Sequence, residues 1–522
     1  MIKRALLVLV LAASIQRTPA PAFALDEATA AQLQDWMSSG RYTARQVAEL
    51  YLRRIEEIDR SGPALHSVIE VNPDALAIAD ALDAERTARG PRGPLHGVPV
   101  LIKDNIDTGD RMMTTAGSLA LEGSRPSRDA FVVERLRAAG VVILGKTNLS
   151  EWANFRSTHA SSGWSGRGGQ VKNPYALDRN PCGSSSGTGA AIAANLAAIG
   201  VGTETDGSIV CPSGANGLVG IKPTVGLVSR TGIIPISHTQ DTAGPMARTV
   251  ADAALLLGAM AGVDPLDAAT KGTAARATRD YSRSLDAGAL KGARIGVARK
   301  PYFGYSEATD RIVNQAIADM KAQGAVIVDP ADIPTASKLD ACEIDILLYE
   351  FKAGLNAYLA SRGPSSPVRS LEALIAFNER EKAREMPYFG QELFLQAQKK
   401  GPLTTPAYLT AAATCRALSR AHGFDLVMRR HRLDAIVAPT GSPAWTTDLV
   451  NGDHFTGASS TPAAVAGYPS ITVPAGQAFG LPVGLSFIGG AWSEARLIGL
   501  AYAYEQATRH RRPPAFATRV PD

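Results

Sequence analysis

The chain has 522 residues, of which 45% are hydrophobic and 20% are charged, a balance typical of a globular protein rather than of a disordered or fibrous one. Its net charge is +5 at neutral pH, and loss of the first 24 residues, with Lys3, Arg4 and Arg17, would lower it to +2. A charge so close to zero does not indicate nucleic acid or a membrane surface as a partner.

The N-terminus has the three parts of a secretory signal peptide. Lys3 and Arg4 form the basic start, an apolar run covers residues 5–15, and Ala22-Phe23-Ala24 fits a small-x-small cleavage site. The alternatives are an uncleaved anchor and a buried helix, although the run is too short to span a bilayer. We therefore expect 1–24 to be removed and 25–522 to be exported, most simply to the periplasm, with no stable membrane association afterwards.

Helices and strands alternate along the rest of the chain. Helical periodicity and capping residues predict helices at two places within 27–58 (the second capped by Thr43) and at 72–88, 129–138, 190–198, 249–260, 306–322 and 493–509. Apolar runs predict strands at 98–104, 141–144, 293–298 and 433–438, and near 470 and 483. Residues 154–182, 199–208 and 212–245 are rich in glycine or proline and are expected as loops and turns. The alternation predicts an α/β/α sandwich with a large mixed, mostly parallel sheet.

Residues 338–420 differ from this pattern and are predicted to be a helical insertion. They contain few β-branched residues and several aromatic ones, namely Tyr349, Phe351, Tyr358, Phe377, Tyr388, Phe389 and Phe394. One interpretation is an ordinary helical core. The other is a cap that shapes one wall of a substrate cleft.

Two serine-bearing turns bracket the short Ala-rich helix in the segment 183–208. Backbone N–H groups at a helix start suit a developing negative charge, and a serine nucleophile needs a base. His159 and His238 are the histidines nearest serine-rich turns, but each is better explained as an ordinary loop residue. Ser185 fits the G-x-S-x-G pattern, which requires a strand directly before it, whereas residues 175–181 are polar and end in proline.

A lysine is the other candidate base. Lys103 ends an apolar strand, where it could simply extend its amine toward solvent. Buried beside serine hydroxyls, it would instead lose its proton near neutral pH, since burial disfavours the charged form. A relay then becomes feasible, in which the attacking serine gives its proton to a second serine and that serine gives one to neutral Lys103.

These segments resemble the amidase signature hydrolases. The resemblance covers about residues 45–265 and 435–508, and rests on Gly97–Asp104, Gly145–Glu151, Gly183–Ala191 and Thr205–Ile209. It implies a Ser–cis-Ser–Lys triad with Ser208 as nucleophile, Ser184 as the cis-serine after a cis Gly183–Ser184 bond, and Lys103 as base. It also implies an oxyanion hole formed by backbone N–H groups of Thr205, Asp206, Gly207 and Ser208. Residues 25–522 would then be one amidase domain.

The sequence departs from the common pattern of that family in two places. The first serine loop reads Cys182-Gly183-Ser184-Ser185-Ser186-Gly187-Thr188, which keeps the triad serine. Val210 occupies the position that commonly holds an arginine for a substrate carboxylate. The runs Thr203–Pro212 and Phe155–Trp164 are similar to bacterial peptide amidases, which implies hydrolysis of the C-terminal amides of peptides to carboxylate and ammonia, with water as co-substrate.

Several alternatives remain open at this point. One is a broad aliphatic or aryl amidase, and another, from a different class, is a periplasmic solute-binding protein, which would not release ammonia from an amide. The glutaminyl-tRNA transamidation subunit shares the implied fold, but an export signal argues against it. The four cysteines, Cys182, Cys211, Cys342 and Cys415, form no C-x-x-C pair, which argues against a zinc or redox site. No metal or organic cofactor is indicated. The sequence does not determine their redox state or the oligomeric state.

Overall fold

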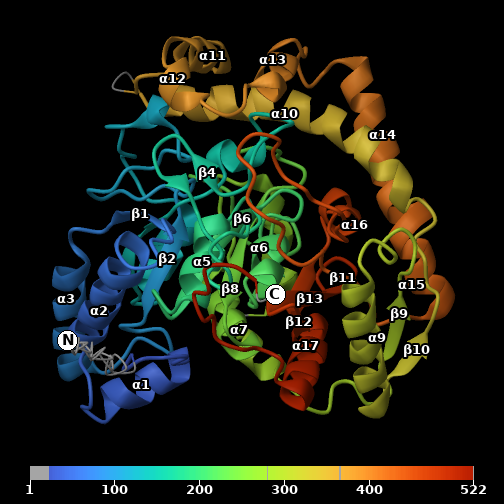
Figure 1. Cartoon of the computed structure of the whole chain (residues 1–522), viewed down its shortest axis with the longest axis horizontal. Coiled ribbons are helices and arrows are strands. Elements are labelled where there is room, and N and C mark those ends of the chain that lie inside the picture. Colours follow the sequence, from blue (N-terminus) through green and yellow to red (C-terminus); the bar gives the residue numbers. More distant parts are fainter. Residues whose placement is uncertain (1–22, 279, 364–365, 521–522) are drawn as a thin grey trace, which may run out of the picture.

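Figure 1 shows the computed structural model of the chain, which describes residues 23–278, 280–363 and 366–520. Nearly all of the predicted signal peptide lies outside the described residues. Within these three stretches, no helix combines the length and the apolar character needed to cross a bilayer.

A large mixed sheet forms the centre of the described chain. It has eleven strands in the order β1-β3-β2-β6-β8-β7-β12-β13-β11-β9-β10. In chain order the strands are β1 (Val68–Val71), β2 (Pro99–Lys103), β3 (Val142–Thr147), β6 (Ile199–Glu204), β7 (Val219–Lys222), β8 (Thr242–Ala247), β9 (Arg294–Val297), β10 (Val326–Val328), β11 (Ala435–Pro439), β12 (Ser470–Ala478) and β13 (Leu481–Ile488). A separate hairpin pairs β4 (Trp164–Ser165) with β5 (Gly169–Gln170).

The prediction of a mostly parallel sheet is wrong. β2 is parallel to β3 and β6, and β9 is parallel to β10 and β11, but the other six pairings are antiparallel. Antiparallel strands need no helical crossover, and β12 and β13 are joined by a tight turn. The alternation of helices and strands along the sequence therefore did not reveal the direction of the central strands.

Helices cover both faces of this sheet, as an α/β/α sandwich requires. Helices α5 and α6 pack on one face, helices α7, α9 and α17 lie against the other, and α4 packs on α7. The helices are α1 (Ala30–Ser38), α2 (Ala44–Arg54), α3 (Ala75–Arg89), α4 (Phe131–Ala138), α5 (Ser186–Ala193), α6 (Val210–Ala215), α7 (Val250–Met260), α8 (Thr273–Arg276), α9 (Glu307–Ala322), α10 (Leu339–Ser361), α11 (Leu371–Arg380), α12 (Lys382–Glu385), α13 (Glu392–Gln398), α14 (Pro406–Ser419), α15 (Asp425–His431), α16 (Thr461–Ala466) and α17 (Glu494–Thr508). Thr43 caps α2 as predicted, in a capping box with Gln46.

Two segments predicted as loops contain strands and a helix. β6 lies within the predicted turn 199–208, and its glycines are needed for packing against α5. A Cβ on Gly200 would lie 2.7 Å from Thr188 Cγ2, and one on Gly202 would lie 2.8 Å from Ser185 Oγ. The segment 212–245 contains most of α6, all of β7 and the start of β8, and only its middle part, 223–241, is a connecting loop. In these two segments, glycine and proline are found where elements pack closely together, and not only where the backbone is irregular.

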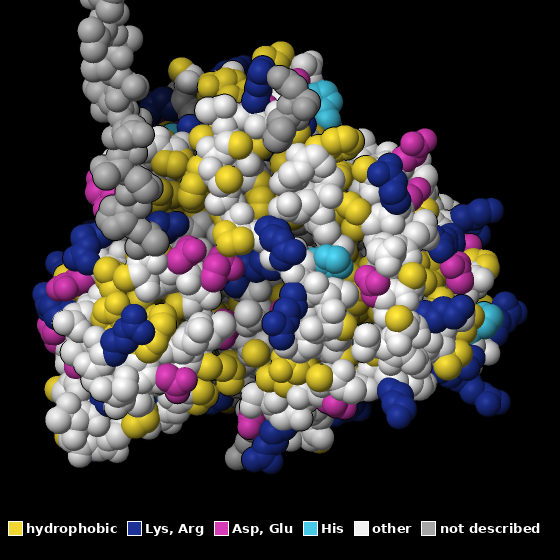
Figure 2. Space-filling view, turned by 60° about the horizontal axis from the view of Figure 1, so that its bottom comes forward, with side chains coloured by type: hydrophobic (Ala, Val, Ile, Leu, Met, Phe, Trp, Pro, Cys, Tyr) yellow, Lys and Arg dark blue, Asp and Glu magenta, His cyan; other side chains and the backbone are white. Residues whose placement is uncertain are grey.

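The region 338–420 is helical, as predicted. Helices α10 to α14 form an arch along the top and right of the view in Figure 1. The long α10 packs along α14, and the Cys342–Cys415 disulfide joins them. On the face shown in Figure 2, basic and acidic side chains are interspersed, in keeping with the small net charge.

Candidate active site

The two serine loops meet beyond the C-terminal end of β6, a strand in the interior of the sheet. Ser184 precedes α5, Ser208 lies between β6 and α6, and the N–H of Ser185 donates to the carbonyl oxygen of Ser208 at 3.2 Å. The Gly183–Ser184 bond is cis, as the resemblance implied. Gly183 is tightly enclosed, since a Cβ there would lie 2.2 Å from Ser150 Oγ.

Lys103 is fully buried at the end of β2 and contacts one of the two serines. Its Nζ lies 2.8 Å from Ser184 Oγ and 2.9 Å from Thr203 Oγ1. Burial lowers the pKa of Lys103 to about 7, although the carboxylates of Glu204 and Asp241 act in the opposite direction. A neutral amine is therefore available beside a serine hydroxyl near neutral pH.

Ser208 lines a cavity of about 350 Å³, together with Thr205, Asp206 and Gly207. Gly207 has a φ of 76°, a value that glycine adopts without strain. The backbone N–H groups of Asp206, Gly207 and Ser208 donate to none of the described residues. Three amides beside the Ser208 hydroxyl are thus free to donate to a ligand in the cavity.

Carboxylates on either side stabilise this loop. Glu204 Oε2 accepts from the N–H groups of Ile209 and Val210 at 2.7 and 2.9 Å, where α6 begins. Asp206 Oδ2 accepts from the Thr461 hydroxyl at 2.7 Å. Burial raises the pKa of both carboxyl groups. The backbone of the loop is therefore tied to its surroundings through side chains at both ends.

A further carboxylate, the half-buried Asp241, was not identified from the sequence. It accepts from the Thr205 hydroxyl at 2.6 Å and from the N–H groups of Ile236 and Ser237 at 2.8 Å each. Burial raises its pKa to about 6. Asp241 and Thr203 line a second cavity, of about 230 Å³, that adjoins the first at Thr205 and Ile236. Asp241 ends a Gly/Pro-rich loop, and such a loop has no hydrophobic periodicity from which its role could be predicted.

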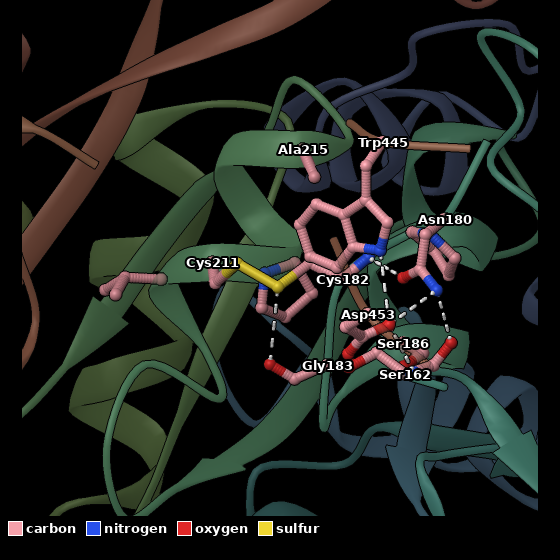
Figure 3. Close-up of a disulfide and its surroundings, with 12 residues drawn as sticks. Ser162, Asn180, Cys182, Gly183, Ser186, Cys211, Ala215, Trp445 and Asp453 are labelled. Atoms are coloured by element: carbon pink, nitrogen blue, oxygen red, sulfur yellow. Dashed lines mark hydrogen bonds between the residues drawn. A yellow bond between two sulfur atoms is a disulfide. The ribbon is translucent and has the colours of Figure 1, made fainter. Parts of the chain in front are cut away.

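A disulfide joins the two serine loops. Cys182 directly precedes Gly183, Cys211 lies in the first turn of α6, and their sulfurs are bonded (Figure 3). Trp445 packs on the pair, and its indole Nε1 donates to Asp453 Oδ1 at 3.2 Å. The sequence left this pairing open because the approach of the Cys182 loop to the start of α6 depends on the sheet.

The remaining cavity walls are mainly apolar and come from distant parts of the chain. Phe155, Ile236, Leu347, Trp445 and Phe455 line the cavity. Leu347, on α10, is the contribution of the helical insertion. The seven aromatic residues noted in that insertion do not line the cavity; five pack into helical clusters, and Tyr388 and Phe389 pack on Trp164. For the five side chains in the helical clusters, the helical-core interpretation is the correct one.

The other nucleophile and base candidates are elsewhere engaged or exposed. Ser185 Oγ donates to the carbonyl oxygen of Thr203 at 3.0 Å and accepts from its N–H at 3.2 Å, so this serine joins α5 to β6. His159 is exposed, and His238 is an exposed residue whose Nδ1 lies 3.4 Å from a Glu350 oxygen. Across the described stretches, no group of three or more His, Cys, Asp or Glu residues is placed to hold a metal ion.

Close packing around the first serine loop gives a stability prediction. A Cβ on Gly187 would lie 2.4 Å from the backbone carbonyl oxygens of both Ser67 and Asn148. Gly187→Ala is therefore expected to lower the free energy of unfolding by about 1–3 kcal/mol, because the backbone must move to make room. Urea unfolding followed by circular dichroism measures this. Gly93→Ala, where a Cβ meets nothing within 4 Å, is the control; equal unfolding midpoints for the two variants would contradict the packing argument.

Comparison with known proteins agrees with this geometry. The model of the family described as Amidase matches residues 46–498. A probable amidase from Arabidopsis thaliana is 45% identical over 507 residues, covering 95% of this chain and 92% of its own. The crystal structure of native peptide amidase from Stenotrophomonas maltophilia is 52% identical, with a TM-score of 0.91, covering 95% of this chain and 99% of that one. A structure of the peptide amidase PAM with the competitive inhibitor chymostatin is 53% identical, with a TM-score of 0.91, covering 94% and 99%.

Proposed function

The chain belongs to the amidase family and is an amidohydrolase, and from that premise we propose that it hydrolyses the C-terminal amide of peptides to carboxylate and ammonia. The observation that carries the proposal is the cavity in which Ser208, three free backbone amides and an apolar wall meet, with the Lys103–Ser184 pair buried behind the first serine loop. The similarity to peptide amidases supports the choice of substrate.

In the proposed reaction, Ser208 Oγ attacks the carbonyl carbon of the terminal amide. Its proton passes to Ser184, which gives its own proton to neutral Lys103. The free amides of Asp206, Gly207 and Ser208, with Thr205 beside them, stabilise the oxyanion that forms. Return of the proton to the nitrogen releases ammonia and leaves an acyl-enzyme. Water then attacks the acyl-enzyme by the same route and releases the peptide acid.

The charges around the cavity favour an amide over a carboxylate at its end. Of the described residues that line the cavity, the charged ones are Asp206 and Asp453, and none is a lysine or arginine. Members of the family commonly have an arginine at the position of Val210, and the valine of this chain supplies no positive charge there. A neutral terminal amide avoids the repulsion that a free carboxylate would meet beside these two acids. The apolar wall suits the side chains that precede the amide.

We also propose that the enzyme works after export. Two disulfides, Cys182–Cys211 and Cys342–Cys415, are typical of proteins from oxidising compartments. Together with the signal-like segment 1–24, they support a periplasmic location. N-terminal sequencing of the protein from a periplasmic fraction tests this, with residue 25 expected first. An N-terminus at Met1, in protein recovered from the cytoplasm, would contradict it.

The substrate proposal predicts how a mixed panel will behave. Peptide amides should release ammonia and keep an intact chain, because we propose that the cavity is closed beyond the terminal amide, whereas an internal peptide bond needs room on both sides. Mass spectrometry of an amidated peptide after incubation should therefore show a gain of one mass unit without fragments. The same peptide with a free carboxylate is the control and should remain unchanged. Internal fragments would refute the proposal, and equal rates on simple aliphatic amides would favour the broad amidase.

A further inference from the structure

The Cys182–Cys211 disulfide occupies the point where the two serine loops join. Cys182 is two residues before Ser184, and Cys211 is three residues after Ser208. Both cysteines line the same cavity as Ser208. Relative movement of the loops is therefore limited by one covalent bond at the cavity wall.

The backbone at Cys182 adds to this argument. Cys182 has a φ of 58°, in the left-handed region that residues with a Cβ rarely adopt. Its N–H donates to Asn180 Oδ1 at 2.8 Å, and its sulfur lies 3.7 Å from the Gly183 carbonyl oxygen (Figure 3). A strained conformation of this kind persists where the surroundings hold it, and the disulfide is the strongest of these connections.

Besides the two serine loops, the cavity wall around Trp445 also contacts this disulfide. Trp445 packs on the disulfide beside Ala215, and Asp453, which accepts from its indole, also accepts from the Ser162 N–H and hydroxyl at 2.9 and 2.6 Å. The segment between Trp445 and Asp453 leads to Phe455, another wall residue. Both serine loops and this apolar wall thus meet at the disulfide.

We propose that Cys182 and Cys211 are positioning residues for the hydrolysis, and that reduction of their disulfide converts the enzyme to a form with a much lower kcat. The proposal rests on the roles proposed above for Ser184 and Ser208. A dithiol reductant supplies the two electrons and two protons; the S–S bond breaks, two S–H bonds form, and the reductant becomes a cyclic disulfide. The freed loops then no longer hold the nucleophile, the cis-serine and the lysine in register, and a displacement of about 1 Å can cost a hundredfold in rate.

For an exported chain, the bond has a direct consequence. In a reducing cytoplasm the two thiols stay apart, and the disulfide forms only in the oxidising compartment. The enzyme would then gain its full rate after export, where it cannot hydrolyse cytoplasmic amides.

The second disulfide provides a matched control. Cys342–Cys415 joins α10 to α14 within a cluster that includes Ile346, Tyr349 and Tyr408, and neither cysteine lines the Ser208 cavity. Its cysteines are 73 residues apart in sequence, against 29 for Cys182 and Cys211. Because a longer closed loop restricts the unfolded chain more, loss of Cys342–Cys415 should lower the Tm at least as much.

The experiment compares the two pairs in the full mature chain. The kcat and KM for a peptide amide are measured by ammonia release, and the Tm by circular dichroism, for Cys182→Ser/Cys211→Ser and for Cys342→Ser/Cys415→Ser. We expect kcat to fall about 10–100-fold in the first variant and to change less than about twofold in the second. Near-equal kcat values, or a fall in kcat that follows the Tm in both variants, would overturn the proposal.

Reduction of the Cys342→Ser/Cys415→Ser variant, which retains the Cys182–Cys211 disulfide, covers the case in which the first variant does not fold. Dithiothreitol is added to the folded enzyme under mildly destabilising urea, thiols are counted, and ammonia release is followed in the Cys342→Ser/Cys415→Ser background. Activity should fall as two thiols appear and return on reoxidation. Full activity with both thiols free would overturn the proposal. If the oxidised wild type releases no ammonia from any peptide amide, it is the proposed function that fails.

Discussion

Replacing Ser208 by alanine is expected to reduce kcat by about a million-fold and to leave the fold intact. The Ser208 Oγ makes no hydrogen bond to any of the described residues, so its removal leaves no buried group unpaired. Because the Ser208 side chain borders the cavity, removing its hydroxyl also costs little packing. Ammonia release and the Tm, measured on the same preparation, separate the loss of the nucleophile from a loss of folding.

Ser185→Ala is the control for this prediction. The Ser185 hydroxyl makes two hydrogen bonds to the Thr203 backbone, so its removal should lower the Tm while keeping a measurable kcat. The reverse result, with near-normal activity in a folded Ser208→Ala variant and a million-fold loss in Ser185→Ala, would identify Ser185 as the nucleophile.

Lys103→Arg is expected to reduce kcat by about 10⁴-fold, although it keeps a basic side chain. An arginine stays protonated at every working pH and cannot accept a proton from Ser184. In the wild type, Lys103 has a pKa of about 7, so kcat/KM should fall below that pH as the amine becomes charged. The pH dependence of kcat/KM, measured by ammonia release, tests both parts.

Four further variants identify the group whose protonation causes this fall in kcat/KM, the acidic limb of the pH profile. His159→Ala and His238→Ala should retain it, since both histidines are exposed residues. Asp241→Asn should shift it to lower pH, because the Asp241 carboxylate raises the pKa of Lys103. A limb that disappears with either histidine but persists in Lys103→Ala would refute the lysine mechanism.

Lys103 should also make the free energy of unfolding depend on pH. The folded chain holds Lys103 neutral above pH 7, whereas the unfolded chain keeps it protonated up to its ordinary pKa of 10.5. The unfolded state therefore binds more protons between these values, and the contribution of Lys103 to stability rises with pH across this window. Below pH 7, protonating the buried Lys103 amine lowers the free energy of unfolding by an amount on the order of 5 kcal/mol. In Lys103→Met, this part of the pH dependence of urea unfolding should be absent.

Local sequence patterns sufficed for the lysine strand and for the outer helices. The apolar run before Lys103 predicts a buried strand, and capping residues such as Thr43 and Thr249 are found where helices α2 and α7 begin. Such features depend on residues a few positions apart, which is the range over which backbone propensity and capping act. The matches to the amidase signature motifs are equally local. They place Ser184 and Ser208 in two loops, although strand β6, which lies between α5 and Ser208, was not predicted.

Long-range packing decided what these patterns left out. The glycines of β6 predict a turn, but they are there because α5 packs closely against the strand. The direction of β7 and β8 depends on pairing with strands that are distant in sequence. The cavity joins Phe155, Leu347 and Trp445, which no local period relates. The disulfide that joins the serine loops is likewise a product of the sheet, since β6 and the helices on it bring Cys182 and Cys211 together. The sequence by itself thus determined which groups are available for the chemistry, because side-chain type and short spacing are local properties. Only the tertiary structure decided how those groups are enclosed and held in place, because that depends on contacts between residues far apart along the chain.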